Sequence, residues 1–266
     1  MRGSNELAPD QPSPSPPLPW KRRGDPARAR LSKNPRGNMS SAKIHPTAIV
    51  DPAAEIGVDV EIGPFSIVGP QVTIGEKTIV QSHVVIEGDI TIGSGNFIGH
   101  GALIGAAPQD VSFSPDRKTK VEIGNNVVIA NNCLLAGYVC VDDGAFLGGG
   151  STFHQFMRIG RLVMVQGSSA FGKDLPPFVI AAERNQVFGL NVVGLRRAGF
   201  STVDRDEIKA AFKLVYLTGL NISQVLDKAA TLKFGKHARE FLDFVADAKK
   251  RGICPFKRGS REDTPA

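Results

Sequence analysis

The sequence has few aromatic residues, few cysteines and no long apolar run. Aromatic side chains make up 7% of the 266 residues, which suits a thin core filled by aliphatic side chains better than a wide globular one. Cys133, Cys140 and Cys254 form no CxxC pair and are odd in number, as expected in a reducing, cytoplasmic compartment. No run of 18 apolar residues and no apolar segment near the N-terminus occurs, so we expect no stable membrane insertion and no secretory signal.

The positive charge is also absent from most of the chain. The formal net charge is +6, but residues 1–38 hold eight Lys or Arg against Glu6, Asp10 and Asp25. The remainder is nearly neutral, so the charge predicts no nucleic-acid partner. Residues 1–40 are rich in Pro and Arg and are expected to be disordered. They resemble a transit peptide, a nucleic-acid or membrane tail, or translated sequence upstream of a start at Met39, and the last interpretation fits best.

An aliphatic or Phe residue returns every six positions through most of the chain. The series runs from Ile44 to Ile104 and resumes in phase from Ile123 to Phe171. A period of six fits neither a helix nor simple alternation, but it fits a chain that turns a corner every six residues. Three short strands then make one triangular coil of 18 residues. We therefore predict a mainly β protein with a parallel β-helix, whose small residue after each aliphatic one suits the tight corner.

The period of six is confined to part of the chain. We expect the β-helix over residues 43–200, with residues 108–120 protruding as a loop. Helical spacing then follows, and capping residues near Ser201 support a small helical domain over residues 201–256 with helices near 201–216, 222–233 and 236–250. Residues 257–266 are expected to be a flexible tail.

Among the histidines, His154 stands out because it follows a run of three glycines at 148–150, where backbone amides are accessible. It could equally be a polar surface residue on a coil. His83 and His100 are about one coil apart, but they occupy different hexad positions, and no third ligand is evident. We therefore predict no metal and no cofactor.

Eight stretches in order resemble the acyl-acyl carrier protein–UDP-N-acetylglucosamine O-acyltransferases of lipid A biosynthesis. They are IHPTAIVDPAAEIG, IGPFSIVGP, SHVVIEG, IGAAPQD, LAGYVCVDD, FHQF, KDLPPFVIA and FGLNVVGLRRAGF. The resemblance implies a left-handed β-helix, a homotrimer, and transfer of a 3-hydroxyacyl chain from acyl carrier protein to the 3-hydroxyl of UDP-N-acetylglucosamine.

The resemblance also implies roles for individual residues. Gly137 resembles the glycine whose backbone amide holds the oxyanion, and Gly167 resembles the position that limits acyl length. Five residues resemble contacts to the acyl chain, the sugar, the nucleotide or its phosphates, namely Gln109, Asp110, His154 with Gln155, Asn191 and Arg197. The cations Arg196, Arg197 and Lys249–Arg251 could dock an acidic carrier protein, or they could be ordinary solvated helix ends.

The chain departs from the family where the catalytic base histidine usually lies. The family segment that reads roughly AHIAHD is missing between Ile123 and Gly137, together with about two coils, roughly forty residues. No histidine therefore stands at the usual base position, and His154 is a weak substitute. Tyr138 and Val193 replace a frequent histidine and a frequent glutamate. The chain is thus expected to be a member of this family with impaired activity, an acyltransferase for another acceptor, or an inactive scaffold.

Overall fold

The computed structural model describes residues 42–106, 120–248 and 251–257. The chain divides into two units, residues 1–37 and 38–266, and every described residue lies in the second. The predicted disordered extension 1–40, nearly all of the predicted loop 108–120, and all but the first residue of the predicted tail 257–266 lie outside the described residues. Lys120, which we placed in the loop, is instead the first residue of a strand.

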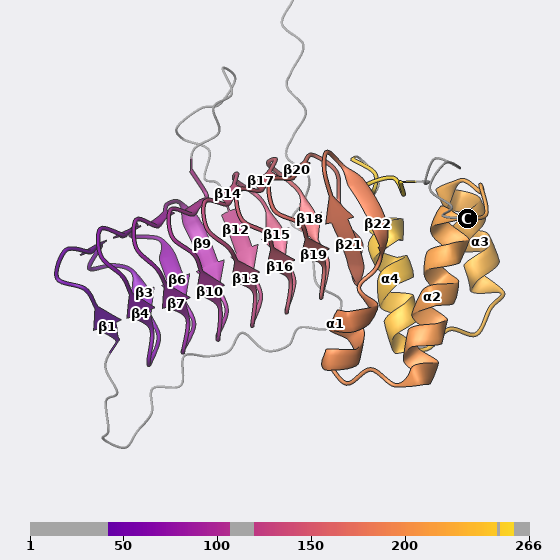
Figure 1. The fold of residues 1–266 in the computed structure, drawn as a ribbon, viewed down its shortest axis with the longest axis horizontal. Helices are drawn as coiled ribbons and strands as arrows, with labels where there is room; N and C mark the ends of the chain where they lie inside the picture. The colour runs from indigo at the N-terminus through magenta and orange to yellow at the C-terminus, as the bar shows by residue number, and fades with distance from the viewer. Residues whose placement is uncertain (1–41, 107–119, 249–250, 258–266) are drawn as a thin grey trace, which may run out of the picture. The chain divides into compact units, whose positions relative to one another are not determined.

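The described part of the second unit is a parallel β-helix followed by helices, as the hexads predict (Figure 1). Its first sheet contains β1 (Lys43–Ile44), β4 (Glu61–Ile62), β7 (Ile79–Val80), β10 (Phe97–Ile98), β13 (Val128–Ile129), β16 (Phe146–Leu147), β19 (Met164–Val165), β21 (Val179–Ala182) and β22 (Gln186–Leu190). Its second contains β2 (Ile49–Val50), β5 (Ile67–Val68), β8 (Val85–Ile86), β11 (Leu103–Ile104), β14 (Leu134–Leu135), β17 (Thr152–Phe153) and β20 (Ala170–Phe171). Its third contains β3 (Glu55–Ile56), β6 (Val72–Ile74), β9 (Asp89–Ile92), β12 (Lys120–Ile123), β15 (Cys140–Val141) and β18 (Arg158–Ile159).

The register of the sheets sets the length of a coil. Ile62 pairs with Val80, 18 residues later, and the same offset joins Leu135 to Phe153. Across residues 107–119 the offset is 31, since Phe97 pairs with Val128. The extra thirteen residues are those that the structure does not describe, so the hexad phase is the same on both sides of them.

The small residue after each aliphatic one has a different cause from the one we predicted. A Cβ on Gly75 would lie 2.6 Å from the carbonyl carbon of Gly93, so the glycine allows two coils to stack closely. The left-handed backbone of the corner lies two residues further on, as at His83 (φ 59°) and Tyr138 (φ 62°). The prediction that the small residue serves the turn itself is therefore wrong, because coil stacking imposes it.

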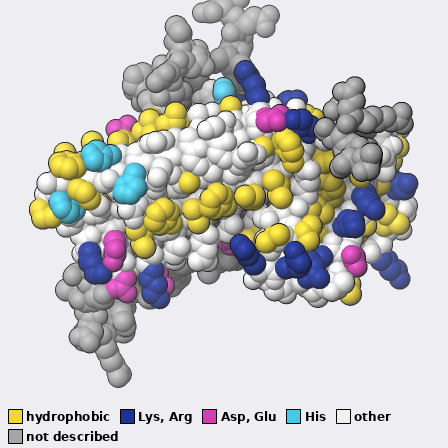
Figure 2. Space-filling view, viewed as in Figure 1, with side chains coloured by type: hydrophobic (Ala, Val, Ile, Leu, Met, Phe, Trp, Pro, Cys, Tyr) yellow, Lys and Arg dark blue, Asp and Glu magenta, His cyan; other side chains and the backbone are white. Residues whose placement is uncertain are grey.

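The outward faces of the three sheets differ in character. The first sheet exposes Phe97, Phe146 and Met164, and the second exposes Ile49, Ile67 and Leu134. Figure 2 shows the apolar row that runs along the first sheet. The third sheet instead presents Glu55, Thr73, Thr91, Glu122, Cys140 and Arg158. Two adjacent faces of the prism are thus apolar and the third is polar.

Four helices follow the β-hairpin of β21 and β22. They are α1 (Val192–Arg197), α2 (Thr202–Tyr216), α3 (Ile222–Ala230) and α4 (Lys236–Asp247). The last three were predicted, and α2 begins with a capping box between Ser201 and Asp204. Helix α1 was not predicted. No helix in the described ranges is both long and apolar enough to cross a membrane.

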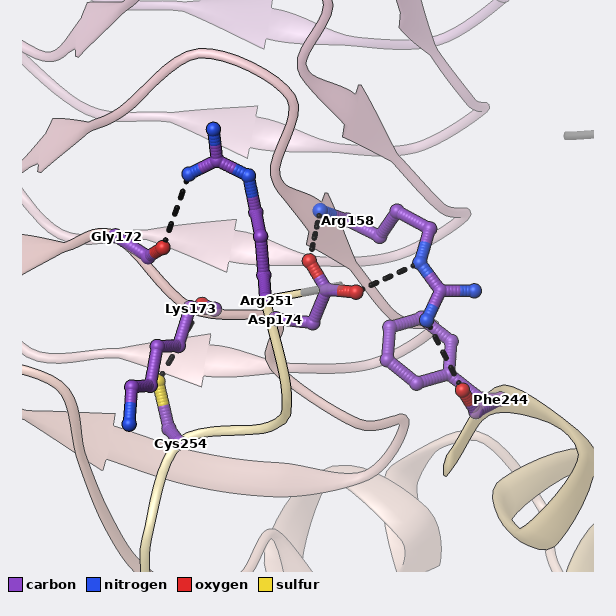
Figure 3. Close-up of polar contacts among 7 residues, drawn as sticks. All are labelled: Arg158, Gly172, Lys173, Asp174, Phe244, Arg251 and Cys254. Carbon is purple, nitrogen blue, oxygen red and sulfur yellow. Dashed lines mark hydrogen bonds and ion pairs between the residues drawn. The ribbon is translucent and has the colours of Figure 1, made fainter. Parts of the chain in front are cut away.

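A buried ion pair joins the last coils to α4. Arg158 Nε lies 2.8 Å from Asp174 Oδ2, and the two side chains are 13% and 6% exposed. Arg158 Nη2 also donates to the carbonyl of Phe244, and its guanidinium lies 4.2 Å from the centroid of that ring (Figure 3). Arg158 Nη1 is buried without a hydrogen-bond partner in the structure. The pair therefore carries a desolvation cost that its contacts must offset.

Replacement of Gly75 by alanine should destabilise the prism by about 1–3 kcal/mol, since the added methyl would overlap backbone atoms. Gly189→Ala is the matched control, because a Cβ added at Gly189 would have no atom within 4 Å. Urea unfolding would measure both free energies. Equal stability of the two variants would contradict the stacking explanation.

Asp174→Ala should lower the free energy of unfolding by about 3–5 kcal/mol, because it leaves the buried Arg158 charge uncompensated. Glu183→Ala removes the partner of Lys257 in an exposed pair and should cost less than about 1 kcal/mol. Denaturant titration of both variants gives the comparison. A loss at Asp174 no larger than that at Glu183 would show that the buried pair is unimportant.

Candidate active site

The candidate site is built along one edge of the prism, where the second sheet turns into the third. This second–third edge comprises the corner residues after β11, β14, β17 and β20. Gly137 lies at the corner after β14, and His154 and Gln155 lie at the corner after β17. Ala106, the last described residue before the unplaced segment 107–119, belongs to the corner after β11. Gln109 and Asp110 belong to that segment and lie outside the described residues.

Gly137 has the property that an oxyanion donor requires. Its carbonyl accepts a hydrogen bond from the amide of Phe156 in the next coil, at 3.2 Å. Its own amide donates to no acceptor within the described part of the chain. An N–H group at a fixed corner is therefore available to a ligand.

His154 is exposed, and its contacts involve one ring nitrogen. Nδ1 lies 3.3 Å from the carbonyl oxygen of Gln155 and 3.4 Å from Arg251 Nη1. Because arginine can only donate, the second contact requires Nδ1 to accept, and Nε2 then carries the proton. In that tautomer His154 offers a ligand an N–H donor. It cannot act as a base through the same atom.

Aromatic rings and Arg251 form a stack beside His154. Tyr138 and Phe156 are 18 residues apart, and their rings are parallel with centroids separated by 4.5 Å. The guanidinium of Arg251 lies 5.6 Å from the centroid of Phe156. In the sequence, Tyr138 is a departure from the family and Arg251 belongs to a cationic cluster at an expected helix end. The stack that joins them was not predicted.

The C-terminal segment 251–257, here called the clasp, brings Arg251 to this edge. Ile253 forms a β-bridge with Asp174, and Phe256 forms one with Val187. The amide of Cys254 donates to the carbonyl of Asp174, and the Cys254 thiol donates to that of Lys173 (Figure 3). Helix α4 ends at Asp247, so Arg251 is not a solvated residue of a helix end. Lys249 and Lys250 lie outside the described residues.

The other predicted site residues lie at different edges. Gly167 is exposed at the first–second edge, the corner after β19. Asn191 caps α1, since its Oδ1 accepts from the amide of Gly194 and its Nδ2 donates to the carbonyl of Leu162. Leu162 lies at the third–first edge, after β18, and Arg197 is exposed in the last turn of α1. One subunit therefore does not bring the predicted residues together.

His83 and His100 have separate surroundings at the first–second edge. The ring of His83 lies 5.2 Å from that of Phe65, and His100 Nδ1 lies 2.7 Å from Ser82 Oγ. Within the described ranges, no three His, Cys, Asp or Glu residues are grouped to hold a metal ion.

Comparison with known proteins agrees with this architecture. Residues 174–254 match the model for domain 2 of UDP-N-acetylglucosamine O-acyltransferases, and residues 53–88 and 71–106 match that for bacterial transferase hexapeptide repeats. The solved structure of LpxA from Acinetobacter baumannii is 33% identical, with a TM-score of 0.57, and the match covers 79% of this chain and 98% of that one. The chain belongs to the UDP-N-acetylglucosamine O-acyltransferase family.

Two further members support the same placement. The UDP-N-acetylglucosamine acyltransferase from Campylobacter jejuni is 27% identical, has a TM-score of 0.57 and is covered over its whole length by 81% of this chain. The acyl-[acyl-carrier-protein]–UDP-N-acetylglucosamine O-acyltransferase of Burkholderia lata is 42% identical over 122 residues. That alignment spans 44% of this chain and 47% of the relative, so the chain matches about half the length of its curated relatives.

The clasp makes a prediction about cysteine reactivity. Burial and the charge of Asp174 raise the pKa of Cys254 to about 12, and burial raises the pKa of Cys133. A raised pKa keeps a thiol protonated, so alkylation of the folded protein at pH 8 should spare both residues. Cys140, half-buried on the third sheet, should be labelled first. Peptide mass spectrometry after alkylation measures the order, and early labelling of Cys254 would mean that the clasp is open in solution.

Proposed function

We propose that this chain transfers a 3-hydroxyacyl group from acyl carrier protein to the 3-hydroxyl of UDP-N-acetylglucosamine, the first step of lipid A biosynthesis, and does so slowly. The new ester bond forms as the carbon–sulfur bond of the thioester breaks, and the hydroxyl proton ends on the released thiolate. The observation that carries the proposal is the second–third edge, where the Gly137 amide and the His154 side chain occupy successive corners without a general base.

The substrates are inferred from the relatives. The Burkholderia lata relative is named for both acyl carrier protein and UDP-N-acetylglucosamine. The exposed Arg197 in α1 supplies a cation for an anionic ligand, and exposed Arg196 adds another. Three free cysteines fit a reducing cytoplasm, where we place the protein.

The available donors support part of the reaction. An amide aimed at the developing oxyanion contributes about 10²–10³ in rate in enzymes that use one, and the Gly137 amide is available for this role. His154 in the tautomer described above can donate a hydrogen bond to the sugar or nucleotide from Nε2. Both groups favour binding and charge stabilisation, and neither removes the proton of the attacking hydroxyl.

The base is the missing component. The sequence contains no histidine between His100 and His154, the interval in which the resembling family carries its base. Loss of whole coils explains this, since each coil contacts only its neighbours and the remaining coils still stack. Consistent with a shortened prism, 79% of this chain matches 98% of the Acinetobacter baumannii structure. A positioned base supplies about 10²–10⁴ in rate, which is the expected deficit.

We further propose a homotrimer, because the two apolar faces are adjacent. Packing the first sheet of one subunit against the second sheet of the next would bury both apolar rows and leave the polar third sheet in water. The second–third edge of one subunit would then border a cleft with the third–first edge of its neighbour. This arrangement would unite His154 and Gly137 with Asn191 and Arg197 across subunits, and Gly167 would line the buried interface.

An inactive scaffold is the second candidate, and the missing base favours it. A transfer assay with purified protein, 3-hydroxyacyl carrier protein and UDP-N-acetylglucosamine separates the two. The proposed enzyme should turn over with a kcat about 10²–10⁴ below that of the Acinetobacter baumannii relative under the same conditions. His154→Ala should raise the KM for the sugar nucleotide and leave the pH dependence of kcat unchanged.

Three results would contradict the proposal. A rate equal to the relative's would mean that another group acts as base. Loss of the acidic limb of the pH profile in His154→Ala would identify His154 as that base. No turnover above background from a folded trimer would favour the scaffold.

A further inference from the structure

Arg251 is held in place by few of its hydrogen-bond donors. Nη1 donates to the carbonyl of Gly172 at 3.2 Å and lies 3.4 Å from His154 Nδ1. No other donor of the guanidinium has an acceptor among the described residues, and none is a buried atom left without a partner. Figure 3 shows the guanidinium directed away from the Arg158–Asp174 pair. Nε and Nη2 are therefore available to a ligand.

No carboxylate neutralises Arg251 within the described part of the chain. Asp174 is the nearest acidic group in the clasp contacts, and it is bound by Arg158 at 2.8 Å. The other clasp ion pair, Lys257 with Glu183, is closed on itself. Lys173 adds a further cation at this corner, although its side chain points away from Arg251 in Figure 3. The local charge is thus positive and uncompensated.

The guanidinium is also partly removed from water. It lies against Phe156, and burial lowers the pKa of Arg251 from its ordinary value. A guanidinium that is partly desolvated, oriented by one carbonyl and stacked on a ring binds an anion more strongly than a freely hydrated one. The clasp fixes this geometry through its β-bridges to Asp174 and Val187.

We infer that Arg251 is a phosphate-binding residue of the second–third edge, presented there by the C-terminal clasp. Its free N–H groups would bind two oxygens of a phosphoester or diphosphate side by side, beside the ligand-facing nitrogen of His154. The existence of this anion site follows from the contacts of Arg251. The identity of the anion rests on the proposed function, which offers two sources, the diphosphate of the sugar nucleotide and the phosphodiester of the carrier's phosphopantetheine arm.

Calorimetric titration of the full chain with three probes tests the inference. The probes are pyrophosphate, UDP-N-acetylglucosamine and 4′-phosphopantetheine. Arg251→Gln should weaken pyrophosphate binding about tenfold or more, and it should weaken one of the two organic ligands by a similar factor. Arg251→Lys keeps the charge without the planar fork, so it should lose affinity by a smaller factor. The ligand whose affinity falls is the source of the phosphate.

Lys257→Gln is the matched control, since it removes one positive charge from the same clasp at a residue paired with Glu183. It should leave all three affinities unchanged. Melting temperatures of all variants establish that the clasp and the fold are retained, and Arg251→Lys carries the test if Arg251→Gln does not fold.

The outcomes separate this inference from the proposed function. Unchanged affinities in Arg251→Gln, or a wild-type protein that binds no pyrophosphate, would overturn the anion site. Equal losses in Lys257→Gln would reduce it to a general charge effect and would also overturn it. Arg251-dependent binding of pyrophosphate by a protein that binds neither organic ligand would preserve the anion site and refute the proposed function.

Discussion

The 18-residue coil is the constraint on which the rest of the structure depends. Most prism strands contain only two residues, so no strand is stable alone, and each is held by the ladders to the coils before and after it. A change in chain length is tolerated only when it returns the chain to the same hexad phase. The thirteen additional residues between Ala106 and Lys120 satisfy this condition, because Phe97 still pairs with Val128. Loss of whole coils satisfies it as well, which is why a shortened prism can keep its fold and lose its base.

The same constraint separates the functional residues. Residues at one hexad position recur along one edge, so Gly137 and His154 share an edge, whereas Gly167 and Asn191 lie at the other two. A prism has flat faces, and a site of any depth must form between prisms. The two apolar faces supply the surface for that association. Catalysis and assembly are therefore the same problem in this architecture.

The hexads were sufficient to predict the β-helix, and helical spacing with capping residues predicted α2, α3 and α4. They were not sufficient for α1, which has six residues and follows its cap directly after a strand. The role of the small residue after each aliphatic one was misassigned, because a sequence shows where glycine recurs and not which atoms approach it. The edges occupied by Gly137, His154 and Gly167 follow from hexad phase. The contact between Arg251 and His154 does not, since it joins residues 97 positions apart that share no period.

Mixed trimers test most directly whether the site is divided between subunits. A His154→Ala chain and an Arg197→Ala chain, which alter different edges, would be unfolded, mixed in equal amounts and refolded, and binding of UDP-N-acetylglucosamine would be measured. If each site takes one edge from each of two neighbours, the mixture should regain about a quarter of the wild-type sites although neither variant binds alone. A mixture that binds no better than its components would place both residues in a site within one subunit and would contradict the shared cleft.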